Sequence, residues 1–531
     1  MVFPIAADEL QEEPGAAAEL VVQANAGRQL TVDNGHSDCS DDDGTPFCTI
    51  QAAVDVAEAA DTITVIGNDF ANVYLEAVMI TQNNLTLVGQ GYPVVATLSE
   101  EGTAVSITAN NISLQGFALG FSHVGLVLSE AEGATISDNV ISYNFEAGIV
   151  AAGGQNNRLL ANLISWQGGA GVLLVKEVGD VLEGNTAVLN GHWSNARNST
   201  ENIGDQLRSA MQSSKTSLET VQANPVIQPE ALQKSLETLQ PLLLDVPTTN
   251  ENQSAPLADS VPSSGIIAYE TENLRIESNV AAGNLMGGIL LLEAEQAHIE
   301  ANELFLNGLF GIGLGASSQN RLQANQLAFN FGWAGIWVAE ESQQNSVVDN
   351  HIFFQQHLEL DWPLDEAASI LVVSDGNEIL GNEMGFGDHY GLVVFGHGNQ
   401  IIGNEAVGNG HHRHGNNATT EQSAEAGNRA KKQRRSGHLI VGNNNVLQEN
   451  TASLNGRYGF RLIGSNNTMQ ANEAWGNHRD GFRLEGQANL IADNASFHNR
   501  GFGFFNVGDN SYSNNQCGNN RHGSHPVACI E

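Results

Sequence analysis

Residues 137–162 read SDNVISYNFEAGIVAAGGQNNRLLAN, and the chain returns to this phrase every 22–23 residues from about residue 83 onward. Later versions are EANELFLNGLFGIGLGASSQNRLQAN at 300–325 and ADNASFHNRGFGFFNVGDNSYSNN at 492–515. A fixed period of this length is the signature of a repeat architecture. Asn residues mark the same point in successive copies: Asn139, Asn162, Asn185, Asn279, Asn302, Asn325, Asn350, Asn382, Asn404, Asn450, Asn472 and Asn494.

Short apolar segments lie between these Asn residues, and many follow the pattern Gly-φ-x-φ, in which φ is apolar. Examples begin at Gly148, Gly288, Gly391 and Gly459. Alternation with period two predicts strands that bury one face. Leucine-rich repeats need a Leu spacing that is missing, and helical repeats need 3.6-residue periodicity. We therefore predict a solenoid of parallel strands with coils ~4.8 Å apart, in which stacked Asn side chains bond the backbone and have a structural role.

The segment 45–89 reads TPFCTIQAAVDVAEAADTITVIGNDFANVYLEAVMITQNNLTLVG. It begins with an amphipathic helix that has Ile50, Ala53, Val54 and Ala57 on one face, followed by a strand and the first coils. With the repeats, it resembles the right-handed parallel β-helix of the pectin-lyase-like superfamily over most of residues 45–515. The resemblance implies an all-β, single-stranded right-handed parallel β-helix of 22–23 residues per coil, whose open end the helix caps. It matches no specific catalytic family.

Three insertions interrupt the repeat, each just before a Gly-φ-x-φ strand, so all three should project from one corner of the solenoid. The expected organisation is an N-terminal extension at 1–44, the capping helix and first coils at 45–190, a helical and linker insertion at 191–263, further coils at 264–410, a low-complexity His-rich and basic insertion at 411–436, and the final coils with a C-terminal cap at 437–531. Residues 357–368 lengthen one coil within this plan. Insertions on one face of a repeat protein commonly build its binding side.

The x residue of each Gly-φ-x-φ strand should point outward. In successive copies it is apolar: Leu173, Ile267, Leu290, Trp337, Leu371, Val393 and Leu439. An exposed apolar row of this length would be a liability. We expect the insertion helices, predicted at about 203–222 and 229–244, or another protein to cover part of it; the alternative is a row of scattered surface aliphatics.

The chain is acidic, but its charge is uneven. Its 531 residues include 60 Asp and Glu against 21 Lys and Arg, a formal net charge of −39, which argues against general nucleic-acid binding. Residues 389–531, however, hold 12 of the Lys and Arg, 10 of the Asp and Glu and 10 of the 16 His. The last quarter is therefore locally basic. No apolar run approaches the ~18–20 residues of a membrane span.

The four Cys lie in two close pairs near opposite ends of the chain. Their spacing predicts two local disulfides, Cys39–Cys48 and Cys517–Cys529, and an oxidising compartment. Four free thiols in a cytosolic protein are the alternative. The N-terminus MVFPIAADELQEEPG lacks a basic n-region and a long apolar h-region. The Cys pairs favour a mature exported form with an added Met over a non-secreted chain, so we expect an extracellular or periplasmic protein.

Charged and proton-carrying side chains gather at the insertion corner of the C-terminal coils. Just before successive Gly residues lie Asp388-His389-Tyr390, Arg457-Tyr458, His478-Arg479-Asp480 and His498-Asn499-Arg500. Arg binds carboxylate or sulfate through two parallel hydrogen bonds. We therefore expect an acidic polysaccharide as partner. The predicted substrate-binding residues are Arg457, Arg461, Arg479, Asp480 and Arg483.

The same corner could carry catalysis. Proton abstraction beside a uronate carboxylate needs charge neutralisation by an Arg, a base and an acid. His389, Tyr390 or Tyr458 would move protons, giving a uronate lyase or C5-epimerase. Alternatively, Asp361 and Asp388 would hydrolyse a glycosidic bond if they lay ~6.5–9.5 Å apart. A surface turn that is merely rich in polar residues is the remaining interpretation.

Known catalytic elements of the superfamily are largely missing. Gly396-His397-Gly398 matches one element of polygalacturonases, but their other elements are absent, and a turn is the favoured interpretation. The Arg-x-Pro-x-x-Arg element of pectate lyases and the Asp-Pro-His element of alginate C5-epimerases are also absent. A non-catalytic surface or adhesion rod therefore stands beside the enzyme hypothesis.

Metal binding is a third alternative. His411, His412 and His414 form a dense imidazole cluster, which suits copper, nickel or zinc. The resemblance extends to periplasmic copper-handling NosD-like proteins, which makes a metal-handling role conceivable. The sequence itself requires no cofactor; calcium, copper and zinc are the metals to consider.

The phrase Gly-Phe-Arg-Leu occurs twice, at 459–462 and 481–484. We predict that the two copies occupy one strand position in adjacent coils, with the Phe and Leu side chains inside and Arg461 and Arg483 outside, ~4.8 Å apart. Like charges this close repel. Glu485, on the same face, would relieve part of the repulsion, and an anionic ligand would relieve more.

Overall fold

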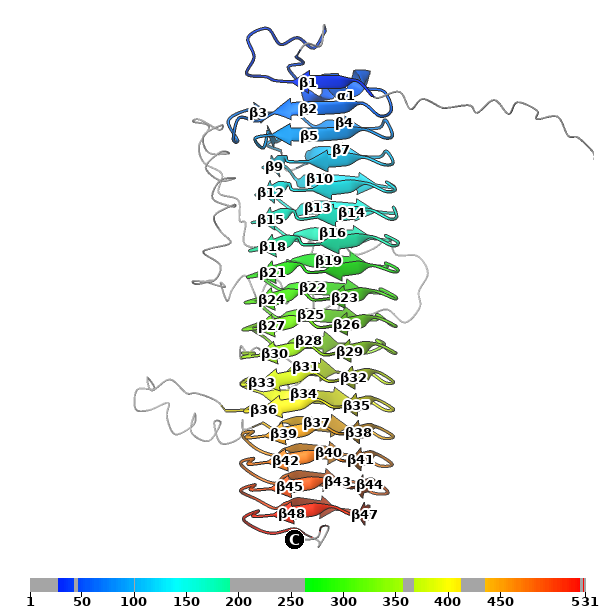
Figure 1. Ribbon diagram of the computed structural model, residues 1–531, viewed down its shortest axis with the longest axis vertical. Helices are drawn as coiled ribbons and strands as arrows, with labels where there is room; N and C mark the ends of the chain where they lie inside the picture. The colour runs from blue at the N-terminus through cyan, green and yellow to red at the C-terminus, as the bar shows by residue number, and fades with distance from the viewer. Residues whose placement is uncertain are drawn as a thin grey trace, which may run out of the picture.

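The computed structural model describes residues 27–42, 46–99, 101–191, 263–356, 367–411, 435–525 and 529. They form one straight solenoid of about 15 turns (Figure 1). The predicted single-stranded right-handed parallel β-helix is confirmed. The predicted insertion helices, Asp361, His412 and His414 lie outside the described residues.

Each coil adds one strand to each of three parallel sheets, which we call A, B and C. Sheet A contains β1 (Gln29–Val32), β2 (Thr62–Ile66), β5 (Thr86–Gln90), β8 (Ser113–Gln115), β11 (Thr135–Ser137), β14 (Arg158–Leu160), β17 (Val181–Glu183), β20 (Arg275–Glu277), β23 (His298–Glu300), β26 (Arg321–Gln323), β29 (Ser346–Val348), β32 (Glu378–Leu380), β35 (Gln400–Ile402), β38 (Val446–Gln448), β41 (Thr468–Gln470), β44 (Leu490–Ala492) and β47 (Ser511–Ser513). Sheet B contains β3 (Val73–Tyr74), β6 (Val94–Val95), β9 (Ala118–Gly120), β12 (Val140–Ser142), β15 (Leu163–Ser165), β18 (Thr186–Val188), β21 (Val280–Ala282), β24 (Glu303–Phe305), β27 (Gln326–Ala328), β30 (His351–Phe353), β33 (Glu383–Gly385), β36 (Glu405–Val407), β39 (Thr451–Ser453), β42 (Glu473–Trp475), β45 (Ala495–Phe497) and β48 (Gln516–Gly518). Sheet C contains β4 (Val78–Ile80), β7 (Thr103–Ile107), β10 (Val124–Ser129), β13 (Ala147–Ala152), β16 (Val172–Val175), β19 (Ile266–Tyr269), β22 (Gly287–Leu292), β25 (Phe310–Gly315), β28 (Ala334–Val338), β31 (Ala368–Val372), β34 (Tyr390–Phe395), β37 (His438–Val441), β40 (Phe460–Ile463), β43 (Phe482–Glu485) and β46 (Phe504–Val507).

Strands of neighbouring coils pair in register, so residues one repeat apart stack in columns that run along the solenoid. Ile149 pairs with Val172, for example, and Phe460 with Phe482. Inward columns are apolar and form one continuous core along the rod. The three inter-strand corners remain fixed from coil to coil, which is why a column of side chains can change its chemistry without a change in backbone.

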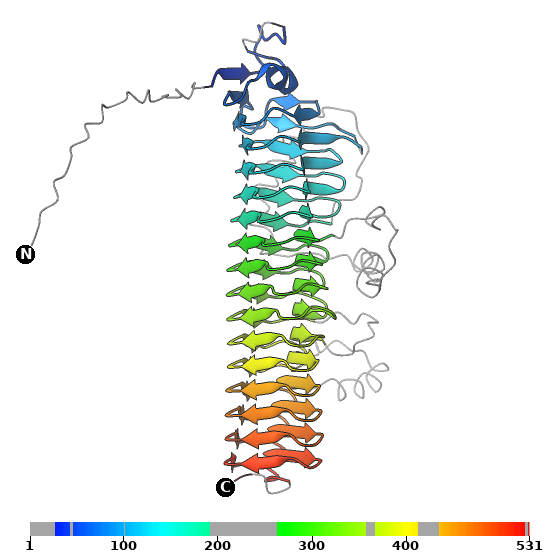
Figure 2. The ribbon, with the colours of Figure 1, turned by 90° about the vertical axis from the view of Figure 1, so that its right-hand side faces the viewer.

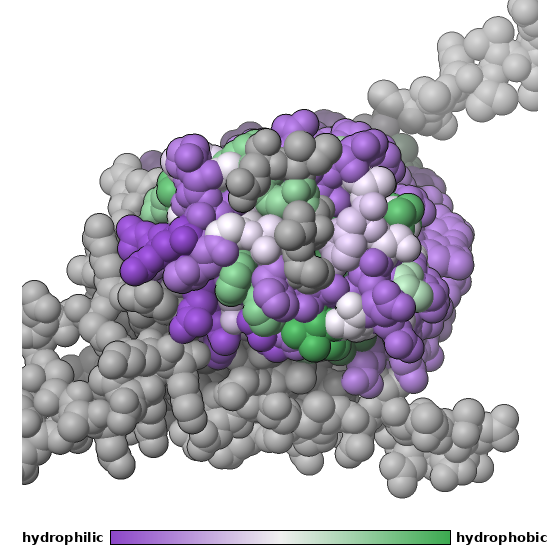
Figure 3. All heavy atoms as spheres, turned by 90° about the horizontal axis from the view of Figure 1, so that it is seen from below, coloured by the Kyte–Doolittle hydropathy of each residue, from purple (hydrophilic) through white to green (hydrophobic). Residues whose placement is uncertain are grey.

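The N-terminal end of the solenoid is capped by the predicted helix. The helix α1 (Ile50–Val56) buries Ile50, Ala53 and Val54 against the first coils (Figure 2). The Glu76 carboxylate accepts the N–H groups of its first residues at 2.9 Å. The last coil presents a mostly hydrophilic surface in the described residues (Figure 3). Both predicted disulfides, Cys39–Cys48 and Cys517–Cys529, are present.

Buried amide side chains form ladders at the corners. Asn139 shows the pattern at the A-to-B corner: its backbone N–H and its Nδ2 both donate to Oδ1 of Asn162, at 3.1 and 3.0 Å, and Nδ2 also donates to the carbonyl of Leu114. The predicted Asn column therefore has the structural role expected of it. A second ladder at the B-to-C corner runs through Asn284 and Asn307, and a third at the C-to-A corner includes Asn345. Losing one rung would leave a buried N–H unpaired, which costs about 1–3 kcal/mol.

The third ladder is broken where Asp180 replaces Asn. Asp180 is 1% exposed, and its Oδ1 accepts the N–H of Asn157 at 2.7 Å. Leu274 follows it in the column, because Val181 pairs with Arg275. Burial, then the neighbouring Glu177 carboxylate, raises the pKa of Asp180 to about 8. Glu177 itself accepts the N–H of Gly154 and an amide hydrogen of Asn157.

We predict that Asp180→Asn stabilises the protein more at pH 8 than at pH 5. A carboxyl whose folded-state pKa is raised binds its proton in the native state, so its stabilising contribution is lost as the pH rises from about 4 to about 8. Asn would keep the bond from Asn157 and remove this loss, which is of the order of 3 kcal/mol or more at pH 8. Denaturant unfolding at both pH values measures it. Equal pH dependence of the two proteins would contradict the assignment.

An inward column of sheet C contains a buried histidine within an aromatic stack. His438, Phe460, Phe482 and Phe504 follow each other with ring centroids 4.7, 4.9 and 4.6 Å apart and nearly parallel planes. His438 Nε2 donates to the Thr451 carbonyl at 3.0 Å, which assigns the proton to that nitrogen. Among the described residues, none bonds its Nδ1. Burial lowers the pKa of His438 to about 4.

We predict that His438→Phe removes a loss of stability in mild acid. The neutral imidazole contributes fully above pH ~6.5, and its contribution falls as the pH drops toward 4, because only the unfolded chain takes up the proton readily. The variant continues the Phe stack. The difference between its melting temperature and that of the parent should therefore shift in favour of the variant as the pH is lowered from 7.5 to 5. A constant difference across that range would argue against the neutral buried His.

Candidate functional site

The outer face of sheet C changes chemistry along the rod. Its central column runs through Ser106, Val127, Val150, Leu173, Ile267, Leu290, Gly313, Trp337, Leu371, Val393, Leu439, Arg461, Arg483 and Phe505. The predicted outward apolar row is buried: its members are 0–6% exposed. They pack in a second apolar cluster with Phe310, Trp333 and Tyr390. The apolar chemistry ends at Leu439, and two Arg residues follow it.

Arg461 and Arg483 are direct neighbours on β40 and β43, as the repeated phrase predicts. The Phe and Leu residues of both phrases are buried in the core. Glu485 lies between the two guanidinium groups. Its carboxylate is 2.8 Å from Nε of Arg483 and 3.4 Å from Nη2 of Arg461. The expected relief of repulsion by Glu485 is therefore present.

Aromatic rings sandwich Arg483. Its guanidinium carbon is 5.3 Å from the ring centre of Tyr458 and 4.7 Å from that of Phe505, and Arg457 lies 4.8 Å over the same Tyr458 ring. Such cation–π contacts contribute about 0.5–2 kcal/mol each. Asp480 adds an ion pair to Arg483 at 3.6 Å. Arg483 thus contacts two rings and two carboxylates, and Arg461 has fewer such partners among the described residues.

The carboxyl groups of the cluster have opposite pKa shifts. Burial raises the pKa of Asp480, although the N–H of Phe502 and two Arg residues oppose the shift. Burial also acts to raise the pKa of Glu485, but Arg483 and Arg461 outweigh it and the net pKa is lowered. We call Arg457, Tyr458, Arg461, Arg479, Asp480, Arg483, Glu485 and Phe505 the arginine cluster. It sets four cations against two carboxyl groups, so it carries positive charge on an acidic protein.

Two of the three candidate proton-transfer residues, His389 and Tyr390, lie apart from this cluster. Tyr390 opens β34 and Tyr458 precedes β40, with β37 between them, so they are two coils apart. Tyr390, His389 and Tyr458 are 2%, 8% and 3% exposed. Asp388 adjoins His389 in the loop before β34, and the guanidinium of Arg435 lies 5.5 Å from the Tyr390 ring centre. The structure therefore brings Tyr458, but not the Asp388–Tyr390 group, to the arginine cluster.

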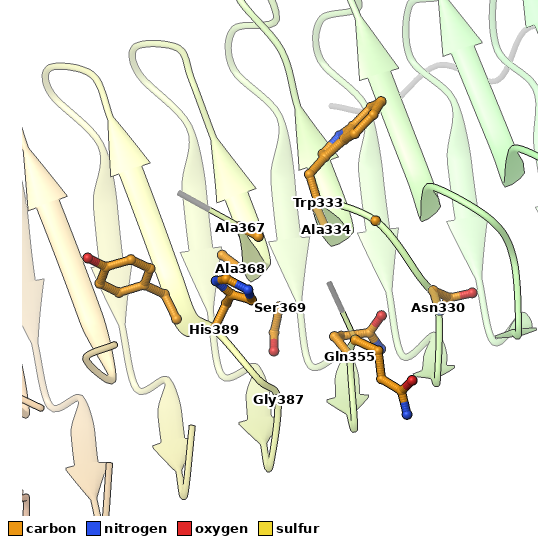
Figure 4. A pocket seen from close by; sticks show the side chains of 12 residues that line it. Asn330, Trp333, Ala334, Gln355, Ala367, Ala368, Ser369, Gly387 and His389 are labelled. Carbon is orange, nitrogen blue, oxygen red and sulfur yellow. The ribbon is translucent and has the colours of Figure 1, made fainter. Parts of the chain in front are cut away.

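The cavity beside His389 is too small for a sugar. Figure 4 shows His389 with Ala368 and Ser369 on one side and Gln355 and Trp333 further along. Its volume is about 10 Å³, the room for one water molecule. Ligand pockets usually measure about 300–1,000 Å³.

A shallow open groove of about 490 Å³ adjoins the arginine cluster. Phe395, Val441 and Ile463 line it from the outer edge of sheet C, and Ile463 pairs directly with Glu485. His397 lies at its side, where its Nδ1 accepts the N–H of Asn443 at 2.9 Å. Gly396-His397-Gly398 is thus a turn, as favoured. The sequence analysis missed this groove, although an apolar residue two positions after each x residue was a visible signal.

The described residues do not form a metal site. His411 Nε2 bonds the Leu454 carbonyl at 2.6 Å, and His438 lies in the core. No group of three or more His, Cys, Asp or Glu within the described ranges could hold an ion.

Among the described residues, none of the helical segments has the length and apolar character that a membrane span requires.

Fold and repeats define the class: the chain is a right-handed parallel β-helix repeat protein. Residues 43–203 and 256–358 match the family described as "Periplasmic copper-binding protein (NosD)". A cell surface glycoprotein of Methanothermus fervidus is 29% identical over 109 residues, which are 20% of this chain and 18% of that protein.

Solved structures with similarity to the chain have low identity. The Dettilon tailspike protein is 14% identical, with 80% of this chain and 66% of that chain covered and a TM-score of 0.38. The A-module of an Azotobacter vinelandii mannuronan C-5 epimerase is 13% identical, with 76% and 89% covered and a TM-score of 0.35. XylC in its complex with xylose is 10% identical, with 79% and 86% covered and a TM-score of 0.41.

We predict that Glu485→Ala lowers stability in a salt-dependent way. Without this carboxylate, Arg461 and Arg483 face each other in register, and Asp480 is the remaining carboxylate paired with them among the described residues. The melting temperature should fall in low salt and recover partly in high salt, because ions screen the repulsion. Glu300→Ala, an exposed carboxylate on sheet A, is the matched control. A salt-independent loss would indicate packing rather than charge.

Proposed function

We propose that the protein is an exported β-helix protein that binds acidic polysaccharide on the outer face of sheet C, at the arginine cluster. The observation that carries the proposal is the in-register Arg461–Arg483 pair, placed on a rigid stack in a chain of formal charge −39. Two disulfides support export. The match to a family described as periplasmic, and to a cell surface glycoprotein, points the same way.

The chemistry of the cluster suits a uronate or sulfate group. Glu485 already shows that a carboxylate can be accepted between the two guanidinium groups. Nε and Nη2 of Arg461 donate to Glu485. A ligand carboxylate or sulfate would accept from the other N–H groups of its guanidinium. The adjoining groove would take further sugar units along the solenoid axis, with their apolar faces on Phe395, Val441 and Ile463.

The arrangement favours binding over turnover. A lyase or C5-epimerase would need a base and an acid beside the neutralising Arg. Tyr458 is the proton-carrying group of the cluster, and it is buried under two guanidinium groups. His389 and Tyr390 are separated from the cluster by β37. We therefore place a non-catalytic surface role ahead of lyase or epimerase chemistry, and a metal-handling role behind both.

The test is the affinity of Arg461→Gln for alginate, pectate and a sulfated glycan. We expect binding about tenfold weaker than that of the parent, because one ligand-facing guanidinium is lost. Titration calorimetry at low and physiological salt measures it. Arg321→Gln, on sheet A, is the matched control and should bind like the parent.

Two outcomes would contradict the proposal. If Arg461→Gln binds every acidic glycan as tightly as the parent does, Arg461 is not part of a glycan-binding site. Release of unsaturated product by the parent, or epimerised residues seen by NMR of the polymer, would show that the face is catalytic.

A further inference from the structure

A second surface, at the corner that follows sheet B, has unusual exposed aromatic residues. Phe329, Phe354 and Phe386 follow β27, β30 and β33 in consecutive coils and are 41%, 44% and 54% exposed. Their rings stack with centroids 5.1 and 5.7 Å apart and planes within 19° of parallel. The rings follow strands of sheet B, on the side of the rod where Figure 1 labels β27, β30 and β33, in coils that precede the arginine cluster along the chain.

These positions are costly for an aromatic side chain. All three residues have φ between 54° and 57°, in the left-handed region. Four other coils place residues better suited to this conformation in the same column, namely Gly283, Gly408, Gly476 and Asn519. Seven further coils place bulky residues there, namely Phe121, Tyr143, Trp166, Leu189, Leu306, Leu454 and His498. A bulky residue there costs roughly 1–2 kcal/mol, and exposed apolar surface brings an aggregation risk. Because Gly and Asn satisfy the same backbone in other coils, folding alone does not require three consecutive exposed aromatic rings in this column.

Carboxylates flank the ring row on the outer face of sheet B. Glu383 and Glu405 are direct neighbours on β33 and β36, and both are exposed. His351 Nδ1 lies 3.0 Å from the Glu383 carboxylate. No ion pair with Glu405 occurs among the described residues. Two like charges in register are destabilising unless a cation relieves them.

We propose that this surface, Phe329, Phe354 and Phe386 with Glu383 and Glu405, docks a basic, apolar-bearing peptide segment of a partner protein. The carboxylates complement lysine or arginine in the segment, and its apolar side chains cover the exposed ring edges. The row of rings and the row of carboxylates both follow the solenoid axis, so the segment lies along the rod. An acidic glycan does not fit, because the carboxylates repel it.

The test uses a labelled ten-residue peptide of alternating lysine and leucine, with a lysine–glycine peptide of equal charge as comparison. At about 0.15 M salt the lysine–leucine peptide should bind the parent at least about tenfold more tightly than the lysine–glycine peptide. The triple variant Phe329→Asn/Phe354→Asn/Phe386→Asn should lose about tenfold in affinity for the first peptide. Asn tolerates the left-handed conformation, so this variant should fold, which circular dichroism checks.

Charge variants complete the test. Glu383→Gln/Glu405→Gln should weaken binding severalfold, whereas Glu183→Gln/Glu300→Gln, a pair of equal charge change on sheet A, should not. Equal binding of both peptides to the parent, or full binding by the folded triple variant, would overturn the proposal. The proposal would also be overturned if a neutral glycan bound the parent but not the triple variant, because the surface would then be a carbohydrate-binding site.

Discussion

The in-register stacking of parallel strands is the constraint on which the rest of the structure depends. Because each residue lies over its counterpart one coil away, every polar group at a corner must bond to the coil above or below. Asn meets that demand, since one amide can both accept a backbone N–H and donate to a carbonyl, as Asn162 does. The ladders hold the corners, and the apolar columns inside fill the core.

In-register stacking also divides the side-chain positions into inward ones that form the core and outward ones that are free to vary. Inward columns remain apolar along the rod, so variation is confined to outward positions. On sheet C the central outward column changes from Leu439 to Arg461 in one step, with no change in strand geometry. Two positions carry an ionisable residue where the pattern calls for an apolar residue or Asn: Asp180 at a corner and His438 in an inward column. Burial raises the pKa of Asp180 and lowers that of His438.

Sequence reasoning predicted the architecture because period-two alternation and a 22–23-residue repeat have few structural solutions. It identified the capping helix, both disulfides and the orientation of Arg461 and Arg483 for the same reason: each follows from local spacing. It found one Asn ladder and missed the ladders at the other two corners, because only one column was aligned. The groove beside Ile463 and the tight packing around Arg483 depend on contacts between coils and on rotamers, which linear spacing does not encode. The sequence spacing puts Tyr390 and Tyr458 two coils apart, and β37 lies between their strands.

The central claim is that a rigid β-helix presents an anion-binding surface at one end of sheet C. A crystal structure of the protein with a bound uronate hexasaccharide tests it most directly. The account predicts a sugar carboxylate within hydrogen-bond distance of the Arg461 guanidinium and the remaining units along Phe395, Val441 and Ile463. A saccharide ordered on another face, or none at a concentration that saturates binding in solution, would contradict it.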